Sequence, residues 1–356
     1  MRPMVTILAE RRKAGSAVVD LDPPYATGGR GYRDGVSPFA RVVSLTAAVA
    51  AAAAALVVGV VALQSDPPDA VAPAAKVRPG APPLTLELGV RADREAVALR
   101  RAARLLADGK RAEAGRSFAR FRSLEARVGR AFATWPVGTV DRLNRLAGLH
   151  PQRAVVQLNL GVALFWAGLA GAEDAWRAAS ASEPDSPYAV AAGNLLHPEY
   201  ARGLPVFVTT VPLPAELDAL EPAAQLDLLR RQATTADGKL LYGVALQRLG
   251  RARSAERVFA AAARQAPRSV EAQVAAAVGR FDKSRPAEAF SRLGPLTRRF
   301  PERATVRFHL GLLLLWSGEV REARTQLTRA TRVEPRSPLA GEARRYLDEL
   351  KAAGVS

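Results

Sequence analysis

The 356-residue chain has no cysteine, and its 51 lysine and arginine residues outnumber its 34 aspartate and glutamate residues, which gives a formal net charge of +17. The absence of cysteine excludes thiol catalysis, disulfide bonds and thiolate-ligated metal sites. The basic excess is typical of a solvated, arginine-rich helical surface or of a protein with an anionic partner, and charge alone does not separate the two.

Residues 1–41 are predicted to form a disordered, basic tail. Glycine and proline interrupt the run DPPYATGGRGYRDGVSP, which leaves few residues that could form a core. Its GGRGYRDG segment resembles the Arg-Gly tails of nucleic-acid-binding proteins, but it occurs once. We therefore expect a flexible tail and no nucleic-acid partner.

Residues 42–63 are predicted to form a single transmembrane helix. This stretch contains no charged residue, and as a helix it would be about 33 Å long, close to the roughly 30 Å of a hydrocarbon core. A cleaved signal peptide and a buried soluble helix are the alternatives. The long leader and the lack of an A-x-A site after Leu63 disfavour the signal peptide.

The charges that flank residues 42–63 predict the orientation of the span. Arginine and lysine dominate the residues before it, whereas Asp66 and Asp69 follow it directly. Since basic flanks stay in the cytoplasm, we expect a cytoplasmic N-terminus and an extracytoplasmic remainder in the cell membrane. Residues 64–90 are then a Pro/Ala-rich linker, whose roughly 20 central residues could reach about 60 Å as polyproline II.

The rest of the chain repeats itself. Small residues recur at a step of 34 residues, at Gly243, Ala277 and Gly311. Prolines recur at the same step, at Pro267, Pro301 and Pro335. Two helices cross closely only where small side chains meet, and proline ends the second helix of each pair. One helical hairpin cannot bury its apolar face alone, so the units must stack into a solenoid.

This pattern resembles the tetratricopeptide repeat, a helix-turn-helix unit of the same length. The predicted fold class is therefore all-α, a solenoid of helical hairpins. The stretch RAVVQLNLGVALFWAG from Arg153 aligns without gaps on RATVRFHLGLLLLWSG from Arg303, which indicates an older duplication. We expect two related halves of three hairpins each, over residues 91–196 and 236–352, each followed by one further helix.

Residues 197–235 interrupt the repeat between the two halves. They begin with HPEYARGLPVFVTTVPLP, rich in proline and β-branched residues, and continue into one predicted helix from Leu217 to Ala233. Two interpretations stay open. The segment is either an extended strap that joins the two halves or a recognition loop that fills the groove.

No catalytic, cofactor or metal site is predicted. His150, His197 and His309 have no ligand partner at a useful spacing. The chain also has no nucleophile elbow and no glycine-rich phosphate loop. We therefore expect no enzyme and no small-molecule substrate.

The resemblance to tetratricopeptide repeats implies a concave surface lined by the first helix of each hairpin. Carrying the family's contact positions onto this chain selects seven residues, which are Asn159, Trp166, Gln247, Arg248, Phe308, His309 and Trp316. Trp166 and Trp316 are equivalent by the duplication. Each is either a groove anchor or a residue packed on the next hairpin or on the strap. Only Asn159 fits the family's carboxylate clamp, so recognition of a carboxyl terminus is not expected.

The sequence thus predicts a membrane-anchored scaffold or adaptor that binds a protein or peptide partner, with envelope assembly as one setting. One alternative is a basic module that binds an anionic envelope polymer or lipid. Another is an accessory domain to a signalling cytoplasmic tail.

Overall fold

The computed structural model describes residues 77–353. The predicted tail, the predicted span at residues 42–63 and most of the predicted linker lie outside the described residues. From residue 77 to residue 353, no helix is long and apolar enough to cross a membrane.

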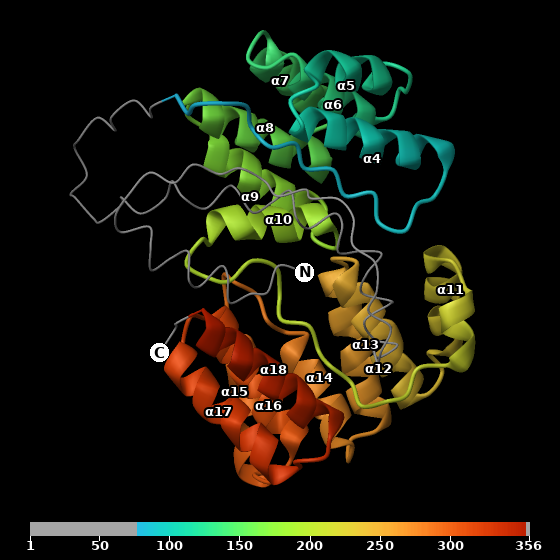
Figure 1. The fold of residues 1–356 in the computed structure, drawn as a ribbon, viewed down its shortest axis with the longest axis vertical. Helices are drawn as coiled ribbons and strands as arrows, with labels where there is room; N and C mark the ends of the chain where they lie inside the picture. The colour runs from blue at the N-terminus through green and yellow to red at the C-terminus, as the bar shows by residue number, and fades with distance from the viewer. Residues whose placement is uncertain (1–76, 354–356) are drawn as a thin grey trace, which may run out of the picture.

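The described residues form two stacks of helices, one above the other in Figure 1. This part of the chain contains fifteen α-helices and no β-strand, so the prediction of an all-α fold is confirmed. Antiparallel neighbours pair into hairpins, three in each half, and one helix follows each set. The first half comprises α4 (Arg94–Ala107), α5 (Arg111–Phe118), α6 (Leu124–Ala133), α7 (Thr139–Leu149), α8 (Ala154–Ala167), α9 (Ala172–Ser182) and α10 (Pro187–Leu196).

The second half has the same order of helices. It comprises α12 (Ala236–Arg248), α13 (Ala252–Gln265), α14 (Val270–Val278), α15 (Ala287–Arg299), α16 (Ala304–Trp316), α17 (Val320–Val333) and α18 (Pro338–Ala352). Between the halves lie a short 3-10 helix, η2 (Ala215–Ala219), and α11 (Pro222–Gln232). The prediction of one helix from Leu217 to Ala233 is therefore wrong. Pro222 lacks an N–H and starts a new helix instead of continuing the first.

Glycine permits the close helix crossings that the repeat predicted. A Cβ added to Gly243 would lie 2.3 Å from Cε1 of Phe259, and one added to Gly161 would lie 2.4 Å from Nε1 of Trp176. No side chain can replace the hydrogen of these glycines without moving an aromatic ring of the facing helix. The prediction that Gly243 marks a crossing is confirmed, and Gly161 marks a crossing of the same kind in the first half.

Serine begins the same two helices in both halves. Its hydroxyl accepts the N–H three residues later and so satisfies one of the unpaired donors of the first turn. The capping residues are Ser123 of α6, Ser186 of α10, Ser269 of α14 and Ser337 of α18. The duplication therefore extends from the core to the helix ends.

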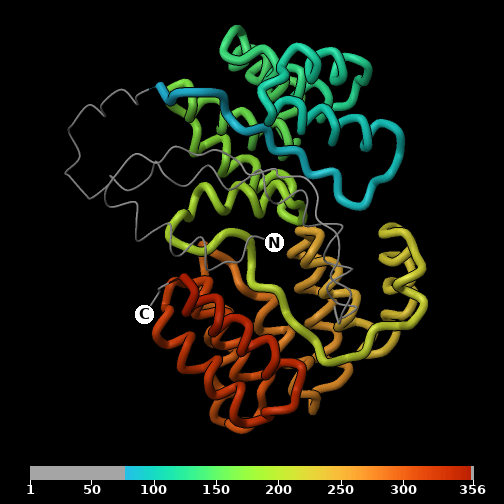
Figure 2. Tube along the Cα trace, in the orientation of Figure 1, coloured from blue at the N-terminus to red at the C-terminus, as the bar shows by residue number. Residues whose placement is uncertain are grey.

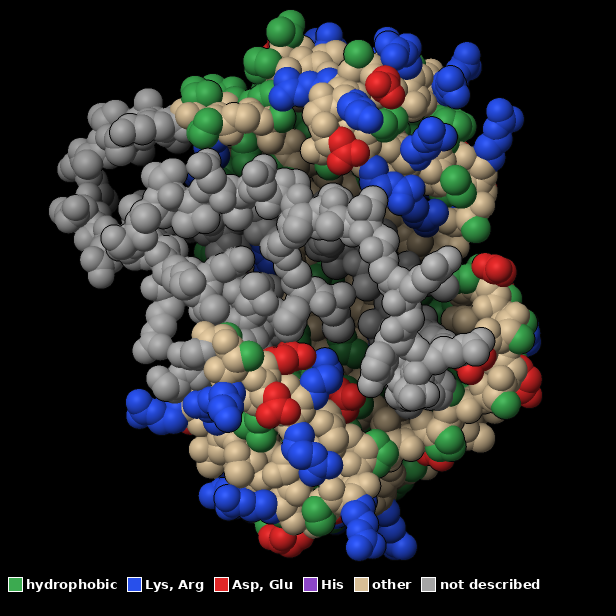
Figure 3. All heavy atoms as spheres, viewed as in Figure 1, with side chains coloured by type: hydrophobic (Ala, Val, Ile, Leu, Met, Phe, Trp, Pro, Cys, Tyr) green, Lys and Arg blue, Asp and Glu red, His purple; other side chains and the backbone are tan. Residues whose placement is uncertain are grey.

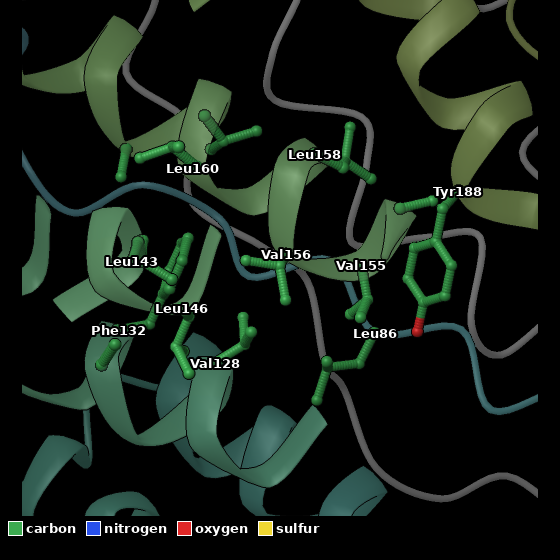
Figure 4. Packing of buried hydrophobic residues seen from close by; sticks show 14 of the residues in the cluster. Leu86, Val128, Phe132, Leu143, Leu146, Val155, Val156, Leu158, Leu160 and Tyr188 are labelled. Carbon is green, nitrogen blue, oxygen red and sulfur yellow. The ribbon is translucent and has the colours of Figure 1, made fainter. Parts of the chain in front are cut away.

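Two extended segments are part of the cores of the halves. Leu86 and Leu88 precede α4 and belong to the apolar cluster of the first half, where Leu86 lies beside Val155 of α8 (Figure 4). Phe207, between α10 and η2, is fully buried in the cluster of the second half. Helices alone therefore do not complete either core.

The two halves contact each other through the turn before α10. The Asp185 carboxylate accepts hydrogen bonds from the backbone N–H of Ser254 at 2.9 Å and from its hydroxyl at 2.6 Å, and it pairs with Arg251 at 3.0 Å. A Cβ added to Gly250 would lie 2.8 Å from both Cα and Cβ of Pro187, so the two residues are closely packed. The junction combines a polar contact with close backbone packing.

Candidate functional site: two grooves filled by the chain itself

An extended segment lies across the first helices of each half. We call residues 78–88 strap 1 and residues 201–211 strap 2. In Figure 2, strap 1 is the blue tube that crosses the first half, and strap 2 is the yellow-green tube that passes along the second half. Both contact residues that the family resemblance selected, Asn159 for strap 1 and His309 for strap 2.

The main chain of strap 1 bonds to the first half. The N–H of Arg78 donates to the carbonyl of Trp166 at 2.9 Å. The side-chain amide of Asn159 binds Thr85 twice, since Oδ1 accepts the N–H of Thr85 at 3.0 Å and Nδ2 donates to its carbonyl at 2.9 Å. Further along, the N–H of Glu87 donates to the hydroxyl of Tyr188 at 3.1 Å, and Figure 4 shows this hydroxyl directed at the strap.

Strap 2 is held by the same main-chain positions. The N–H of Ala201 donates to the carbonyl of Trp316 at 3.0 Å, and that of Val208 donates to Nε2 of His309 at 2.9 Å. The N–H of Thr210 donates to a carboxylate oxygen of Glu271 at 2.6 Å. Gln247 adds a contact, because its Oε1 accepts the N–H of Phe207 at 2.8 Å.

The two straps correspond residue by residue. Three bonded positions in strap 2 lie 123 residues after a bonded position in strap 1, since 201 minus 78, 208 minus 85 and 210 minus 87 are all 123. Their acceptors on α8 and α16 lie 150 residues apart, as 309 minus 159 and 316 minus 166 show. The straps are therefore part of the duplicated unit, and each half consists of a strap, three hairpins and one further helix.

Two further pairs of equivalent residues are alike in the two straps, one pair in backbone conformation and the other in burial. Gly80 and Gly203 both have a positive φ, 80° and 74°, which side chains rarely adopt. Two residues later, Pro82 and Pro205 are both buried. The pattern Gly-x-Pro therefore occurs at the same place in each strap.

Asn159 and His309 hold the straps with different chemistry. Both are fully buried. Asn159 also donates to the carbonyl of Val155 at 2.8 Å, so each of its polar atoms is bonded. His309 donates from Nδ1 to the carbonyl of Thr305 at 2.7 Å, which leaves Nε2 as the acceptor for the strap. Burial lowers the pKa of His309 to about 4, so its imidazole is neutral at physiological pH.

Both predicted tryptophans pack against their surroundings. Trp166 is half-buried against the first core, and the guanidinium of Arg78 lies 5.9 Å from its ring centroid. Trp316 is half-buried between two apolar clusters of the second half. Each contributes its backbone carbonyl to a strap.

Phe308 and Arg248 do not hold a strap. Phe308 is fully buried among α16, α17 and α18, with its ring centroid 6.0 Å from that of Tyr346. The cluster that contains Phe308 also packs against Val208 of strap 2, whereas the hydrogen bond to this strap comes from His309. Arg248 is half-buried, and burial lowers the pKa of its guanidinium while the nearby Glu342 carboxylate opposes that shift.

Tyr188 and Glu271 are strap contacts that the sequence analysis missed. Glu271 accepts from the hydroxyl of Thr209 at 2.7 Å and from that of Thr210 at 2.9 Å. The available signal was the alignment of EARV with EAQV, which pairs Glu125 with Glu271. Strap 1 offers no hydroxyl there, since it has Leu86 and Glu87 in place of the two threonines, and burial raises the pKa of Glu87 to about 7.

Two hollows lie on the surface. One, of about 360 Å³, is beside the end of strap 1 and is lined by Glu125, Arg153 and Tyr188 among others. The other, of about 250 Å³, is lined by Arg307, Arg329 and Arg332 together with Glu302. Within the described residues, no group of three or more histidine, aspartate or glutamate side chains could hold a metal ion.

Comparisons with known proteins give similarity at the level of structure. No family model matches the chain, and no curated protein matches it. The structure is similar to that of YrrB, described as a TPR protein with an unusual peptide-binding site, with 16% sequence identity, 58% of this chain and 99% of that chain covered and a TM-score of 0.29. It is also similar to a tetratricopeptide repeat protein from Parabacteroides merdae, with 11% identity, 73% and 98% covered and a TM-score of 0.30. Both neighbours are tetratricopeptide repeat proteins, the family that the 34-residue step of this chain resembles.

Proposed function

We propose that this protein is a scaffold that binds an extended segment of a partner protein in the groove of its first half. One observation carries the proposal. Both grooves already hold an extended segment through main-chain hydrogen bonds, and Asn159, Gln247 and His309 make them from the positions that the resemblance implied. Main-chain bonds accept many side-chain sequences, so a partner segment can make the same bonds in place of a strap.

The groove of the first half is the better candidate for exchange of its strap for a partner segment. Strap 2 is joined to helices of the described chain at both ends, and its Phe207 is fully buried between Phe259 and His309, with ring centroids 5.6 Å and 4.6 Å away. Strap 1 has the smaller, half-buried Leu84 at the equivalent position. At this position strap 1 therefore buries less apolar surface than strap 2.

The membrane anchor belongs to this proposal as well. With strap 1 seated on the first half, only residues 64–77 of the predicted linker separate a span at 42–63 from the repeats, which corresponds to about 40 Å at 3.1 Å per residue. The scaffold would then work close to the outer face of the membrane, where envelope proteins assemble. A reporter fused after Ser356 should be active only outside the cytoplasm, and cytoplasmic activity would overturn this placement.

The binding proposal is tested with Asn159→Ala in the full chain, purified in detergent. A partner recovered by the wild-type chain should bind this variant at least tenfold more weakly, because the amide that pairs with extended backbone is gone. Asn144→Ala, on the exposed surface of α7, is the matched control and should bind normally. Equal binding by both folded variants would exclude the first groove.

A second candidate function rests on the arginine-lined hollow. Arg307, Arg329 and Arg332 face one acidic side chain there, Glu302, which favours an anionic ligand. On the face shown in Figure 3, however, lysine and arginine side chains are spread over both halves and form no single patch. Binding of an anionic polymer that weakens steeply with salt and is lost in Arg329→Ala would support this function.

A further inference from the structure

We infer that the groove of the first half selects partner segments with the pattern Gly-x-Pro-x-apolar, followed by a neutral residue five positions after the proline, the pattern found in strap 2. This inference rests on the proposed function and specifies its ligand. It follows from comparing two occupants of equivalent grooves, strap 1 and strap 2, that the chain itself supplies.

The glycine and the proline set the path of the segment. Gly80 and Gly203 both take a positive φ, and the N–H two residues earlier bonds to the carbonyl of the tryptophan at the end of the lining helix. A residue with a side chain is strained in this conformation and would shift the register. Buried Pro82 and Pro205 then fix an extended backbone without presenting an unpaired N–H.

The apolar position two residues after the proline faces the core. Phe207 packs edge-on against Phe259 at a centroid distance of 5.6 Å. In the first half, Phe118 is the residue aligned with Phe259, and it is also fully buried. Leu84 packs against the cluster that contains Phe118. A partner with a large apolar side chain at this position would bury it against the same cluster.

The two straps differ in charge five residues after the proline, where strap 1 has Glu87 and strap 2 has the neutral Thr210. Glu87 places a carboxyl in a half-buried site, where desolvation raises its pKa and so disfavours its charge. Its own side chain makes no hydrogen bond or ion pair within the described residues, so nothing there compensates a charge. Strap 2 has Thr210 there, whose hydroxyl and N–H are both bonded. Strap 1 is thus a weaker ligand than a strap-2-like segment, which leaves it open to displacement.

The experiment uses a fluorescent synthetic peptide with the sequence of residues 200–212, YARGLPVFVTTVP, and the full chain in detergent. Thr85→Pro removes the N–H that Asn159 accepts and so weakens strap 1, while Val208→Pro makes the matched change in strap 2. Leu84→Asp weakens strap 1 by another route, in case the proline variant fails to fold. Circular dichroism checks that each variant remains helical.

We expect the peptide to bind Thr85→Pro or Leu84→Asp at least tenfold more tightly than it binds the wild type. A peptide with valine in place of its glycine should bind at least tenfold more weakly, and so should one with glutamate in place of its second threonine. Equal binding of all three peptides to an opened, folded variant would overturn the inferred pattern and leave the proposed groove intact. If folded variants bind no extended peptide, both the pattern and the groove are wrong.

Discussion

The two straps donate main-chain hydrogen bonds from equivalent positions, but different side-chain groups accept these bonds. Strap 1 is held by the neutral amide of Asn159 and the hydroxyl of Tyr188, whereas strap 2 is held by the imidazole of His309 and the carboxylate of Glu271. Main-chain geometry is thus sufficient to place an extended segment in either groove. The side chains determine how strongly it is held and at which pH.

The largest difference between the straps should appear when their central apolar residue is removed. Phe207→Ala deletes a fully buried ring and should lower the free energy of unfolding by about 3 to 5 kcal/mol. Leu84→Ala, at the equivalent but half-buried position, should cost about 1 to 2 kcal/mol, because less area is buried. Denaturant unfolding measures both. Equal losses would mean that strap 1 is seated as firmly as strap 2.

The second prediction concerns acid. The pKa of His309 falls to about 4 in the folded chain, below its ordinary 6.5. The unfolded chain therefore takes up the proton first, so stability that is fully present above pH 6.5 should decline as the pH falls toward 4. The decline is about 1.4 kcal/mol per pH unit, up to about 3 kcal/mol.

The control for this acid effect comes from the first half. In the first half, the amide oxygen of Asn159 accepts the strap hydrogen bond. His309→Asn supplies the same kind of acceptor in the second half, and an asparagine side chain does not titrate. Its free energy of unfolding should lack the added slope between pH 6.5 and 4. An unchanged slope in this variant would assign the acid sensitivity to another group.

The third prediction tests whether the helix crossings of the two halves are alike. Gly161→Leu and Gly243→Leu both drive a side chain into an aromatic ring of the facing helix, and each should cost about 1 to 3 kcal/mol. Gly294→Leu on α15 is the control, since a Cβ there has no neighbour within 4 Å. Wild-type melting temperatures for Gly161→Leu and Gly243→Leu would show that the repeat register is wrong.

The smallest expected effect is a gain in stability. The pKa of Glu87 rises to about 7 in the folded chain, above its ordinary 4.5, so folding becomes less favourable as the pH increases from 4.5 to 7. Glu87→Gln removes the charge and should stabilise the chain by about 1 to 2 kcal/mol at pH 8. The gain should vanish below pH 4.5. A gain that is the same at both pH values would have a cause other than ionisation.

The sequence predicts most of the helices because their pattern is periodic and local. The small residue at each crossing, the 34-residue step and the duplicated stretch around Gly161 and Gly311 required no knowledge of distant contacts. The positions of Asn159, Gln247 and His309 on the concave surface follow from the helical period once the register is known. That they bind a protein or peptide partner remains a prediction.

Strap 1 could not be predicted in the same way. The sequence predicts a linker over residues 64–90, yet the structure places Leu86 and Leu88 of that range in the core of the first half. Leu84, Leu86 and Leu88 alternate over too few residues to stand out in a Pro/Ala-rich stretch. The main-chain hydrogen bonds of strap 1 go to side chains and to the end of a helix. A strand pattern in the sequence does not indicate bonds of this kind. The one usable signal was the second Gly-x-Pro, at residues 203–205.

Strap 2 combines the two interpretations that the sequence left open. It joins α10 to η2, and so connects the halves, and it also packs against the core of the second half and bonds to His309 and Gln247. A short extended segment can do both because its two faces alternate. Phe207 and Thr209 are buried, while Thr210 is exposed.

The straps also change the order in which the chain can fold during its synthesis. Contacts in a helical solenoid are mostly between neighbouring repeats, so each hairpin can fold soon after it is made. Strap 1 precedes its acceptors by 74 residues at Asn159 and by 101 at Tyr188. At about 5 to 20 residues per second, the ribosome makes Tyr188 roughly 5 to 20 s after Glu87. Strap 1 is thus the first part of the first half to be made and the last to be seated, and during that interval its groove is open to any other extended segment nearby.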